Sequence, residues 1–359
     1  MLLDQKFRCV LLSGLLVGLV GCGPQQGEDL WQDYISRLER LTGNMAAPAK
    51  PARRDRYPRH RDLLQPVSEQ RTGLLRYLSL LDCDLMTLVS ERNSVLGRVQ
   101  RESLRLDYEL RFISGGQRCL ASDRLQDDAE MARWLADIVD EKIRDLPSRG
   151  WNLGFAGPEL AGYFRQRPVP AGSPVPPEWP ATVEALARLR TLMASLTMNP
   201  APARLEADIE QALERLDKSS AGGQILDALA LAIQELDRAA TVLEQVDSAR
   251  LCPHGKASER ARYLQNVLFG VYAGQVQPWL ADLSRAAQPL ADATLALRAS
   301  QREIVSPGLD RWLAAQFGED GLSGRYPLAL ARHSRAWQQL LGDCGLMPDA
   351  SSRTRMITD

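Results

Sequence analysis

A cysteine directly after a short apolar run is the first residue whose position points to a specific chemistry. Lys6 and Arg8 precede an apolar stretch at residues 9–20, and Gly21 and Cys22 follow it. A charged start and about 12 apolar residues are typical of a secretory signal peptide and are too short to span a bilayer. Because Gly21 is small, a signal peptidase can reach the bond before Cys22. We expect the Cys22 thiol to carry diacylglycerol and the freed amine to carry a third acyl chain, such as palmitate.

This lipid anchor would fix the location of the protein. Each buried CH₂ contributes roughly 0.8 kcal/mol, so two or three acyl chains hold a protein firmly on a membrane. After Gly23 the chain has no uninterrupted apolar run of about 18 residues, and we expect no spanning segment. Among the bacterial lipoproteins that this signal resembles, an Asp in place of Gly23 would favour the inner membrane. We therefore expect the periplasmic face of the outer membrane; an ordinary signal peptide or a buried amphipathic helix is the alternative for residues 1–22.

Four further cysteines would remain in the exported chain. They are Cys83, Cys119, Cys252 and Cys344. An oxidising compartment favours disulfides, and four cysteines allow three pairings. We expect Cys83 to pair with Cys119, because they lie about 15 and 18 residues on either side of a helix break at residues 97–102 and therefore at similar heights in a helical hairpin. Cys252 is then left for Cys344. The alternatives are four reduced, buried cysteines, or a metal site in which Cys252 and His254 are joined by Cys344 and a carboxylate.

Other residues offer little catalytic chemistry. The chain has three histidines, His60, His254 and His333. None of them is part of a zincin or serine-hydrolase motif, and no phosphate-binding loop or dinucleotide fingerprint is found. Gly115–Gly116 and Gly222–Gly223 are typical of helix ends or turns. We predict no catalytic residue, no metal site and no cofactor other than the covalent lipid.

Charge and composition narrow the class of partner. The chain has 44 basic and 45 acidic residues in 359, a net charge of −1, which gives no sign of nucleic-acid binding.

Composition also indicates the fold class. Aromatic residues make up 6% of the chain and β-branched alternation is scarce, which argues against an all-β fold. We expect one elongated, all-α, multi-helix bundle of helical hairpins.

A proline-containing basic segment at residues 44–62 is the clearest surface feature. Its basic side chains are Lys50, Arg53, Arg54, Arg56, Arg59 and Arg61. One interpretation is a strip that contacts anionic headgroups or glycan, at roughly 1 kcal/mol per charge. The other is a solvated linker, which is the usual nature of charges beside prolines.

Apolar residues at helical spacing predict the elements that position these groups. In the first half we expect a short helix at 28–41, a long core helix at 67–99, its hairpin partner at 104–119, and a helix capped by Ser122-Asp123 and ended by Pro147. In the second half we expect helices at 183–196, 205–216, 226–243 and 328–341, with 219–223 as the turn of a hairpin, and helix starts at Ser258 and Ser306.

These elements predict a division of the chain into consecutive segments. The segments are a signal peptide (1–21), a tether with a short helix and basic linker (22–62), an N-terminal helical layer (63–167), a Pro-rich connector (168–180), a C-terminal helical layer (181–348) and a tail (349–359). The stiff connector would join the two layers.

Four stretches carry a resemblance to a known family. They are the end of the signal at residues 19–22, and residues 77–85, 91–94 and 106–112. These stretches resemble an uncharacterised family of gammaproteobacterial lipoproteins that is described only as a domain of unknown function. The resemblance would cover nearly the whole exported chain. It implies a cell-envelope lipoprotein and supplies no activity, substrate or catalytic residue.

Two classes of function follow from these observations. The first is a non-enzymatic helical scaffold or adaptor, held on the outer membrane by its lipid and bound to an envelope protein partner. The alternative is a periplasmic ligand-binding protein or an enzyme whose carboxylates converge in the fold. A pocket with two buried acids would favour the alternative, and a large exposed apolar groove would favour the scaffold.

Replacing the anchor cysteine tests the expected location. Cys22→Ser should yield an unprocessed or unlipidated protein that no longer fractionates with outer membranes, because the acyl chains are its expected attachment. Mass spectrometry of the wild-type N-terminus and density-gradient fractionation of envelopes measure both effects. Unchanged processing and fractionation of the Cys22→Ser protein would contradict the anchor.

Overall fold

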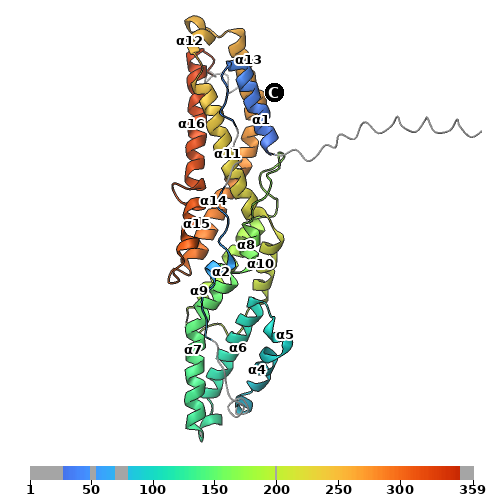
Figure 1. Ribbon diagram of the computed structural model, residues 1–359, viewed down its shortest axis with the longest axis vertical. Coiled ribbons are helices and arrows are strands. Elements are labelled where there is room, and N and C mark those ends of the chain that lie inside the picture. Colours follow the sequence, from blue (N-terminus) through green and yellow to red (C-terminus); the bar gives the residue numbers. More distant parts are fainter. Residues whose placement is uncertain (1–26, 49–53, 69–79, 199, 348–359) are drawn as a thin grey trace, which may run out of the picture.

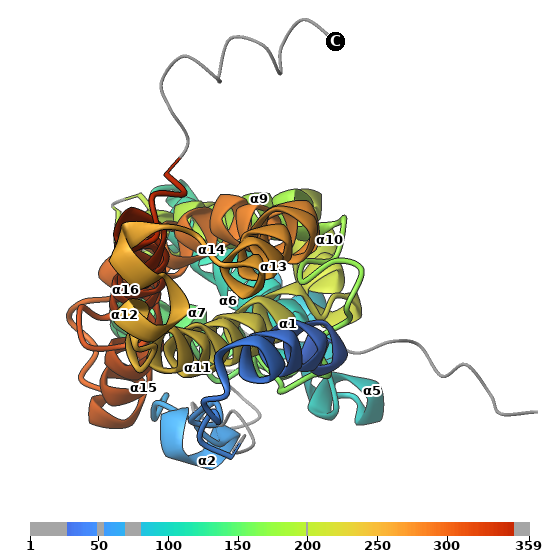
Figure 2. The same cartoon turned by 90° about the horizontal axis from the view of Figure 1, so that it is seen from above.

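The structure is a computed structural model that describes residues 27–48, 54–68, 80–198 and 200–347. Within these ranges all regular elements are helices, and they form an elongated rod whose long axis is vertical in Figure 1. Figure 2 looks along that axis and shows the helices gathered into a compact cross-section. The prediction of an all-α, elongated multi-helix bundle is confirmed. None of the described helices combines the length and the apolar composition needed to cross a bilayer.

One half of the rod is built around α11, which is buried along most of its length. α11 packs along α16 and also against α1, while α13, the π-helical η4 and α14 follow one another beside them. The elements of this half are α1 (Gly27–Thr42), α11 (Ala221–Glu244), α12 (Ser248–Leu251), η3 (Pro253–Gly255), α13 (Glu259–Val267), η4 (Leu268–Val276), α14 (Gln277–Ala299) and α16 (Leu322–Asp343).

The other half is centred on the packing of α6 against α7. Its elements are η1 (Leu80–Cys83), α4 (Met86–Asn93), α5 (Val95–Arg98), α6 (Glu102–Leu120), η2 (Asp123–Leu125) and α7 (Ala129–Leu153). Between the halves lie α2 (His60–Leu63), α8 (Pro158–Tyr163), α9 (Trp179–Ser195), α10 (Ala207–Lys218) and α15 (Pro307–Phe317). α9 contacts α7 as well as α14 and so links the halves directly. The predicted division at the Pro-rich stretch stays a prediction.

Several expected elements are confirmed. α1 matches the helix expected at 28–41, and α9 and α11 match the helices expected at 183–196 and 226–243. The Ser258 hydroxyl accepts a hydrogen bond from the backbone N–H of Ala261 at 3.2 Å and caps α13, as its position predicts. Apolar spacing located these helices correctly because each helix carries one apolar stripe, which packs against the core.

The predicted long helix at 67–99 is wrong where the structure describes it. Residues 80–98 form η1, α4 and α5 instead, because Asp84 adopts the left-handed region with φ 59° and interrupts the helix. Of the predicted buried stripe, Leu81, Val95 and Val99 are 55%, 81% and 77% exposed. Residues 69–79 of this helix lie outside the described residues.

α7 also departs from expectation at both ends. It continues through Pro147 to Leu153, although a proline removes one helical hydrogen bond and clashes with the preceding turn. Full burial of Leu146 and Trp151 on either side of the proline offsets that cost. The cap is Asp128, whose carboxylate accepts from the backbone N–H of Met131 at 2.9 Å, rather than the expected Ser122-Asp123.

The expected hairpin of α10 and α11 is wrong. α10 packs on α8 and α9, whereas α11 runs along α16 and α1. Gly222 and Gly223 lie in the first turn of α11 and are not a loop. A Cβ on Gly222 would collide with the ring of Tyr163, and one on Gly223 would collide with the carbonyl oxygen of Arg165. These glycines therefore permit close packing between helix and loop.

A buried polar cluster joins the first helix to the last. Trp337 Nε1 donates to the Tyr34 hydroxyl at 2.8 Å, and that hydroxyl lies 2.8 Å from His333 Nε2. His333 Nε2 is the only acceptor within reach of the Tyr34 hydroxyl among the described residues, so this hydroxyl donates to an unprotonated Nε2. Burial lowers the pKa of His333 from 6.5 to about 3. The His333 ring is therefore neutral in the folded protein.

His333 makes the stability of the fold depend on pH. Between about pH 3 and 6.5 the unfolded chain protonates this residue and the folded chain does not, so the free energy of unfolding should fall as pH falls, by up to roughly 1.4 kcal/mol per pH unit. Above pH 6.5 the full contribution is present. In chemical denaturation at several pH values, His333→Gln should be less stable near neutrality but show a shallower slope over this range. His254→Asn, at an exposed position, is the matched control, and a slope equal to that of wild type in His333→Gln would contradict the assignment.

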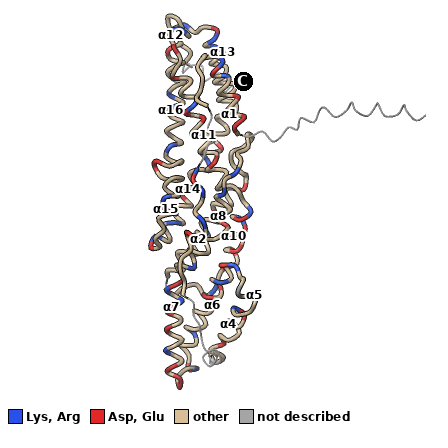
Figure 3. The backbone as a smooth tube through the Cα atoms, viewed as in Figure 1, with Lys and Arg blue, Asp and Glu red and all other residues tan. Residues whose placement is uncertain are grey.

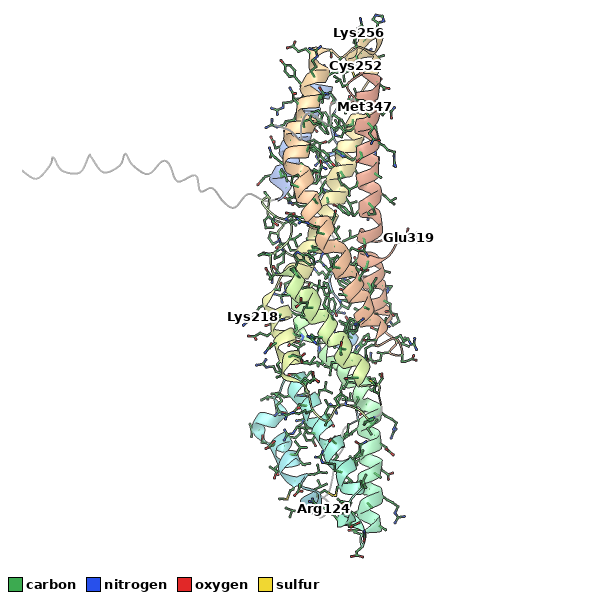
Figure 4. All side chains as sticks on the ribbon, turned by 180° about the vertical axis from the view of Figure 1, so that it is seen from behind. Arg124, Lys218, Cys252, Lys256, Glu319 and Met347 are labelled. Carbon is green, nitrogen blue, oxygen red and sulfur yellow. A yellow bond between two sulfur atoms is a disulfide. The ribbon has the colours of Figure 1, made fainter. Side chains whose placement is uncertain are left out.

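The four described cysteines come together in the two expected pairs. Cys83 at the end of η1 pairs with Cys119 in the last turn of α6, and Cys252 pairs with Cys344 after α16; both Cα–Cα distances are 5.2 Å. In Figure 4, Cys252 lies at one end of the rod and Arg124, which is close in sequence to Cys119, lies at the other. The two disulfides therefore fasten opposite ends.

Peptide mapping of the purified protein without reduction checks this pairing. We expect linked peptides for Cys83–Cys119 and Cys252–Cys344, because each bond closes a long loop and typically adds about 2–4 kcal/mol. Reduction should lower the thermal midpoint of unfolding. A Cys83–Cys252 peptide, or four thiols that alkylate freely without reduction, would refute the pairing.

Candidate functional site

The structure describes all but three of the residues singled out from the sequence. Cys22, Lys50 and Arg53 lie outside the described residues. Cys252, expected in a disulfide and weighed as a metal ligand with His254, is bonded to Cys344. Among the described residues no group of three or more histidine, cysteine or acidic side chains could hold a metal ion.

Arg54, which was expected at an anionic surface, is buried instead. Its guanidinium pairs with Asp227 at 2.7 Å and donates to the carbonyl oxygens of Phe164 and Gly223. Its side chain is 1% exposed, so it cannot reach a membrane surface. Breaking such a buried pair from one side is costly, because the other charge stays desolvated.

The segment that carries Arg54 is packed along the rod and is not a loose linker. Asn44 donates to Val242 O at 3.2 Å, and the Tyr57 hydroxyl donates to Phe155 O at 2.8 Å. The ring of Tyr57 also contacts Phe164 and Trp312. The described parts of residues 44–63 therefore connect both halves of the protein. Of the remaining basic residues, Arg56 is exposed, and Arg59 and Arg61 lie 2.8 and 3.6 Å from Asp62.

A large cleft that the described residues line lies beside the Cys83–Cys119 disulfide. We call it the arginine cleft; its volume is about 700 Å³. It is lined by Cys83, Asp84, Leu85, Leu88, Arg111, Ser114, Gly115, Arg118, Cys119, Ser122, Arg124, Ala203 and Arg204. Four of these residues are arginines and one is an acid, although charges of both signs are interspersed along the rod as a whole (Figure 3).

Three separate segments bring the arginines together. Arg111 and Arg118 are seven residues apart on α6 and so share one face of that helix. Arg124 is in η2, which directly follows α6. Arg204 arrives from the loop before α10, and that loop is held by the Asp107 carboxylate, which accepts from the backbone N–H of Leu205 at 2.9 Å.

Two polar clefts of different character lie near α10. One, of about 620 Å³, is lined by acids and bases in balance: Glu178, Glu214, Arg215 and Lys218. The other, of about 410 Å³, gathers four carboxylates: Glu159, Glu210, Glu214 and Asp217. Burial, with help from Asp217 and Glu210, raises the pKa of Glu159. None of the four is buried, so this cleft does not hold the two buried acids that would indicate acid–base catalysis.

Of these three clefts, the arginine cleft is the one whose side chains are best suited to bind a ligand, namely an anion. Guanidinium groups present planar pairs of donors that match carboxylate and phosphate oxygens. Sequence reasoning missed this cleft, although the pair Arg111 and Arg118 on one face of a predicted helix was a usable signal. Arg204 could not have been assigned, because only the fold brings it to α6.

Comparison with known proteins gives a family and no activity. No curated protein and no solved structure matches the chain. One family matches, described as a protein of unknown function, and its match extends over residues 31–348, which includes both halves of the rod and all four described cysteines. The chain belongs to the DUF3080 family of proteins of unknown function.

Proposed function

We propose that the protein is a lipid-anchored, non-enzymatic helical scaffold or adaptor on the periplasmic face of the outer membrane. The observation that carries this proposal is the short distance along the chain between the anchor cysteine and the rod. Gly27, the start of α1, is the fifth residue after Cys22, and five residues of chain reach at most about 18 Å. The lipid therefore holds the body of the protein close to the membrane surface.

The attachment point lies on the side of the rod. Gly27 N donates to Val169 O at 2.6 Å, and its Cα faces Leu231, midway along α11. α1 itself is locked into the core, since Trp31, Tyr34, Ile35 and Leu38 are fully buried. A rod held by its side, and not by an end, lies along the membrane and presents a long lateral face to partner proteins in the envelope.

Two arginines beside the attachment point support this orientation. Arg165 and Arg167 are exposed and adjoin Val169, and neither guanidinium pairs with an acid among the described residues. Anionic headgroups attract such charges by about 1 kcal/mol each. The sequence predicts a membrane contact at residues 50–61. We assign it instead to Arg165 and Arg167, because Arg54 is buried and Arg59 and Arg61 neighbour Asp62.

A second function, binding of an anionic ligand, is favoured by the arginine cleft. It corresponds to the ligand-binding alternative, with arginines in place of converging carboxylates. A scaffold that also binds a ligand needs no change of fold, because the cleft and the attachment point lie on different elements.

The side-on orientation is tested with vesicles. Unlipidated protein should bind phosphatidylglycerol vesicles in low salt, and Arg165→Gln/Arg167→Gln should weaken binding by roughly fivefold per arginine. Arg59→Gln/Arg61→Gln removes the same charge from residues close to Asp62 and should have a smaller effect. Co-sedimentation measures both. If the Arg59/Arg61 variant were the weaker binder, the contact would lie on the basic segment and the proposed orientation would be wrong.

A further inference from the structure

We propose that the arginine cleft binds a small organic phosphate. The first support is the balance of charge among the residues that line it. Arg111, Arg118, Arg124 and Arg204 face a single acid, Asp84. Such an excess of positive charge in a concave site attracts an anion and repels cations.

The internal partners of these arginines leave most of that charge unneutralised. Arg124 pairs with Asp84 at 2.6 Å, and Arg111 lies 3.7 Å from Asp107. Arg118 donates only to the neutral hydroxyl of Ser114, and Arg204 has no ion pair among the described residues. A ligand that carries two negative charges and several acceptor oxygens satisfies this set better than a single carboxylate does.

The size and walls of the cleft indicate an organic part as well. A volume of about 700 Å³ is far larger than a phosphate needs and falls within the usual range of small-molecule sites. Leu85, Leu88 and the Cys83–Cys119 disulfide add an apolar part to the wall of the cleft. Gly115 makes this wall possible, because any Cβ there would press on the side chain of Leu85. A phosphomonoester on a small alcohol or sugar fits, and so does the phosphate head of a lipid.

Asp84 acts as an internal counter-ion that the ligand displaces. It is held in the left-handed region at φ 59°, an uncommon state for a residue other than glycine, next to the disulfide at Cys83. From there its exposed carboxylate pairs with Arg124. A bound phosphate exchanges with this carboxylate for the same guanidinium, so removal of the Asp84 charge strengthens binding.

The test uses two probes with the same phosphomonoester. The unlipidated chain, without its signal peptide, is titrated with glycerol 3-phosphate by calorimetry and with phosphatidic acid vesicles by co-sedimentation, in low salt. The vesicle arm uses the Arg165→Gln/Arg167→Gln background, so that the proposed membrane contact does not contribute. Binding of glycerol 3-phosphate assigns a soluble phosphate, and binding of vesicles alone assigns a lipid headgroup.

Substitutions in the cleft locate the site. Arg118→Gln and Arg204→Gln should each weaken binding by about tenfold or more, because each removes charge-assisted hydrogen bonds. Asp84→Asn should strengthen binding severalfold, and asparagine tolerates the left-handed conformation. Arg215→Gln, in the charge-balanced cleft near α10, is the control and should bind as wild type does. Circular dichroism verifies that each variant is folded.

The proposal is overturned if neither probe binds. It is also overturned if folded Arg118→Gln and Arg204→Gln proteins bind as tightly as wild type, or if Arg215→Gln weakens binding as much as they do. Failure here would leave the lipid anchor and the side-on orientation untouched, since those are measured on other residues.

Discussion

The hydrogen bonds of the buried Tyr34 hydroxyl to His333 and Trp337 are the interaction on which the rest of the structure depends. It joins α1 to α16 across 299 positions of sequence, through His333 and Trp337. Tyr272 of the π-helical η4 packs on the rings of Tyr34 and His333. Trp31, one turn before Tyr34 in α1, packs on Trp279 of α14. Four elements therefore share one desolvated centre. Trp31 Nε1 and His333 Nδ1 have no hydrogen-bond partner among the described residues, a cost of about 1–3 kcal/mol each that the surrounding aromatic packing must offset.

These contacts make α1 part of the core, so a lipid attached near the start of α1 would restrict the orientation of the whole rod. A lipid on a flexible arm would leave the rod free to stand away from the membrane. The proposed lipid on Cys22, a few residues before a packed helix, would instead fix one side of the rod near the surface. The Val169 carbonyl that accepts from Gly27 belongs to the Pro-rich stretch, whose Pro170 carbonyl accepts from Trp279 Nε1 at 3.3 Å. The stretch expected as a connector thus braces the attachment point.

Local periodicity predicted the helices that pack on one continuous core. α1, α9 and α11 each carry one apolar stripe, and each was located to within a few residues. The same signal failed at residues 80–98, where apolar residues recur at helical intervals but Leu81, Val95 and Val99 have no core to face. Composition likewise misassigned Arg54, because a charged residue among prolines is usually solvated. Its partner Asp227 lies 173 positions away, and a single sequence carries no signal for that pairing.

Charge pairing explains where function can reside on a nearly neutral surface. Many described arginines are neutralised by an acid three or four residues away on the same helix, as in Arg37 with Asp33 and Arg105 with Glu102. Such pairs are worth only a few tenths of a kcal/mol each, but they cancel the local field. Among the described residues, unbalanced positive charge is found where arginines lie close together without enough acids. Arg165 and Arg167, two residues apart in one loop, form one such place, and the arginine cleft forms another. The cleft takes its arginines from α6, η2 and the loop before α10, so tertiary packing assembles a basic site that a net charge of −1 does not reveal.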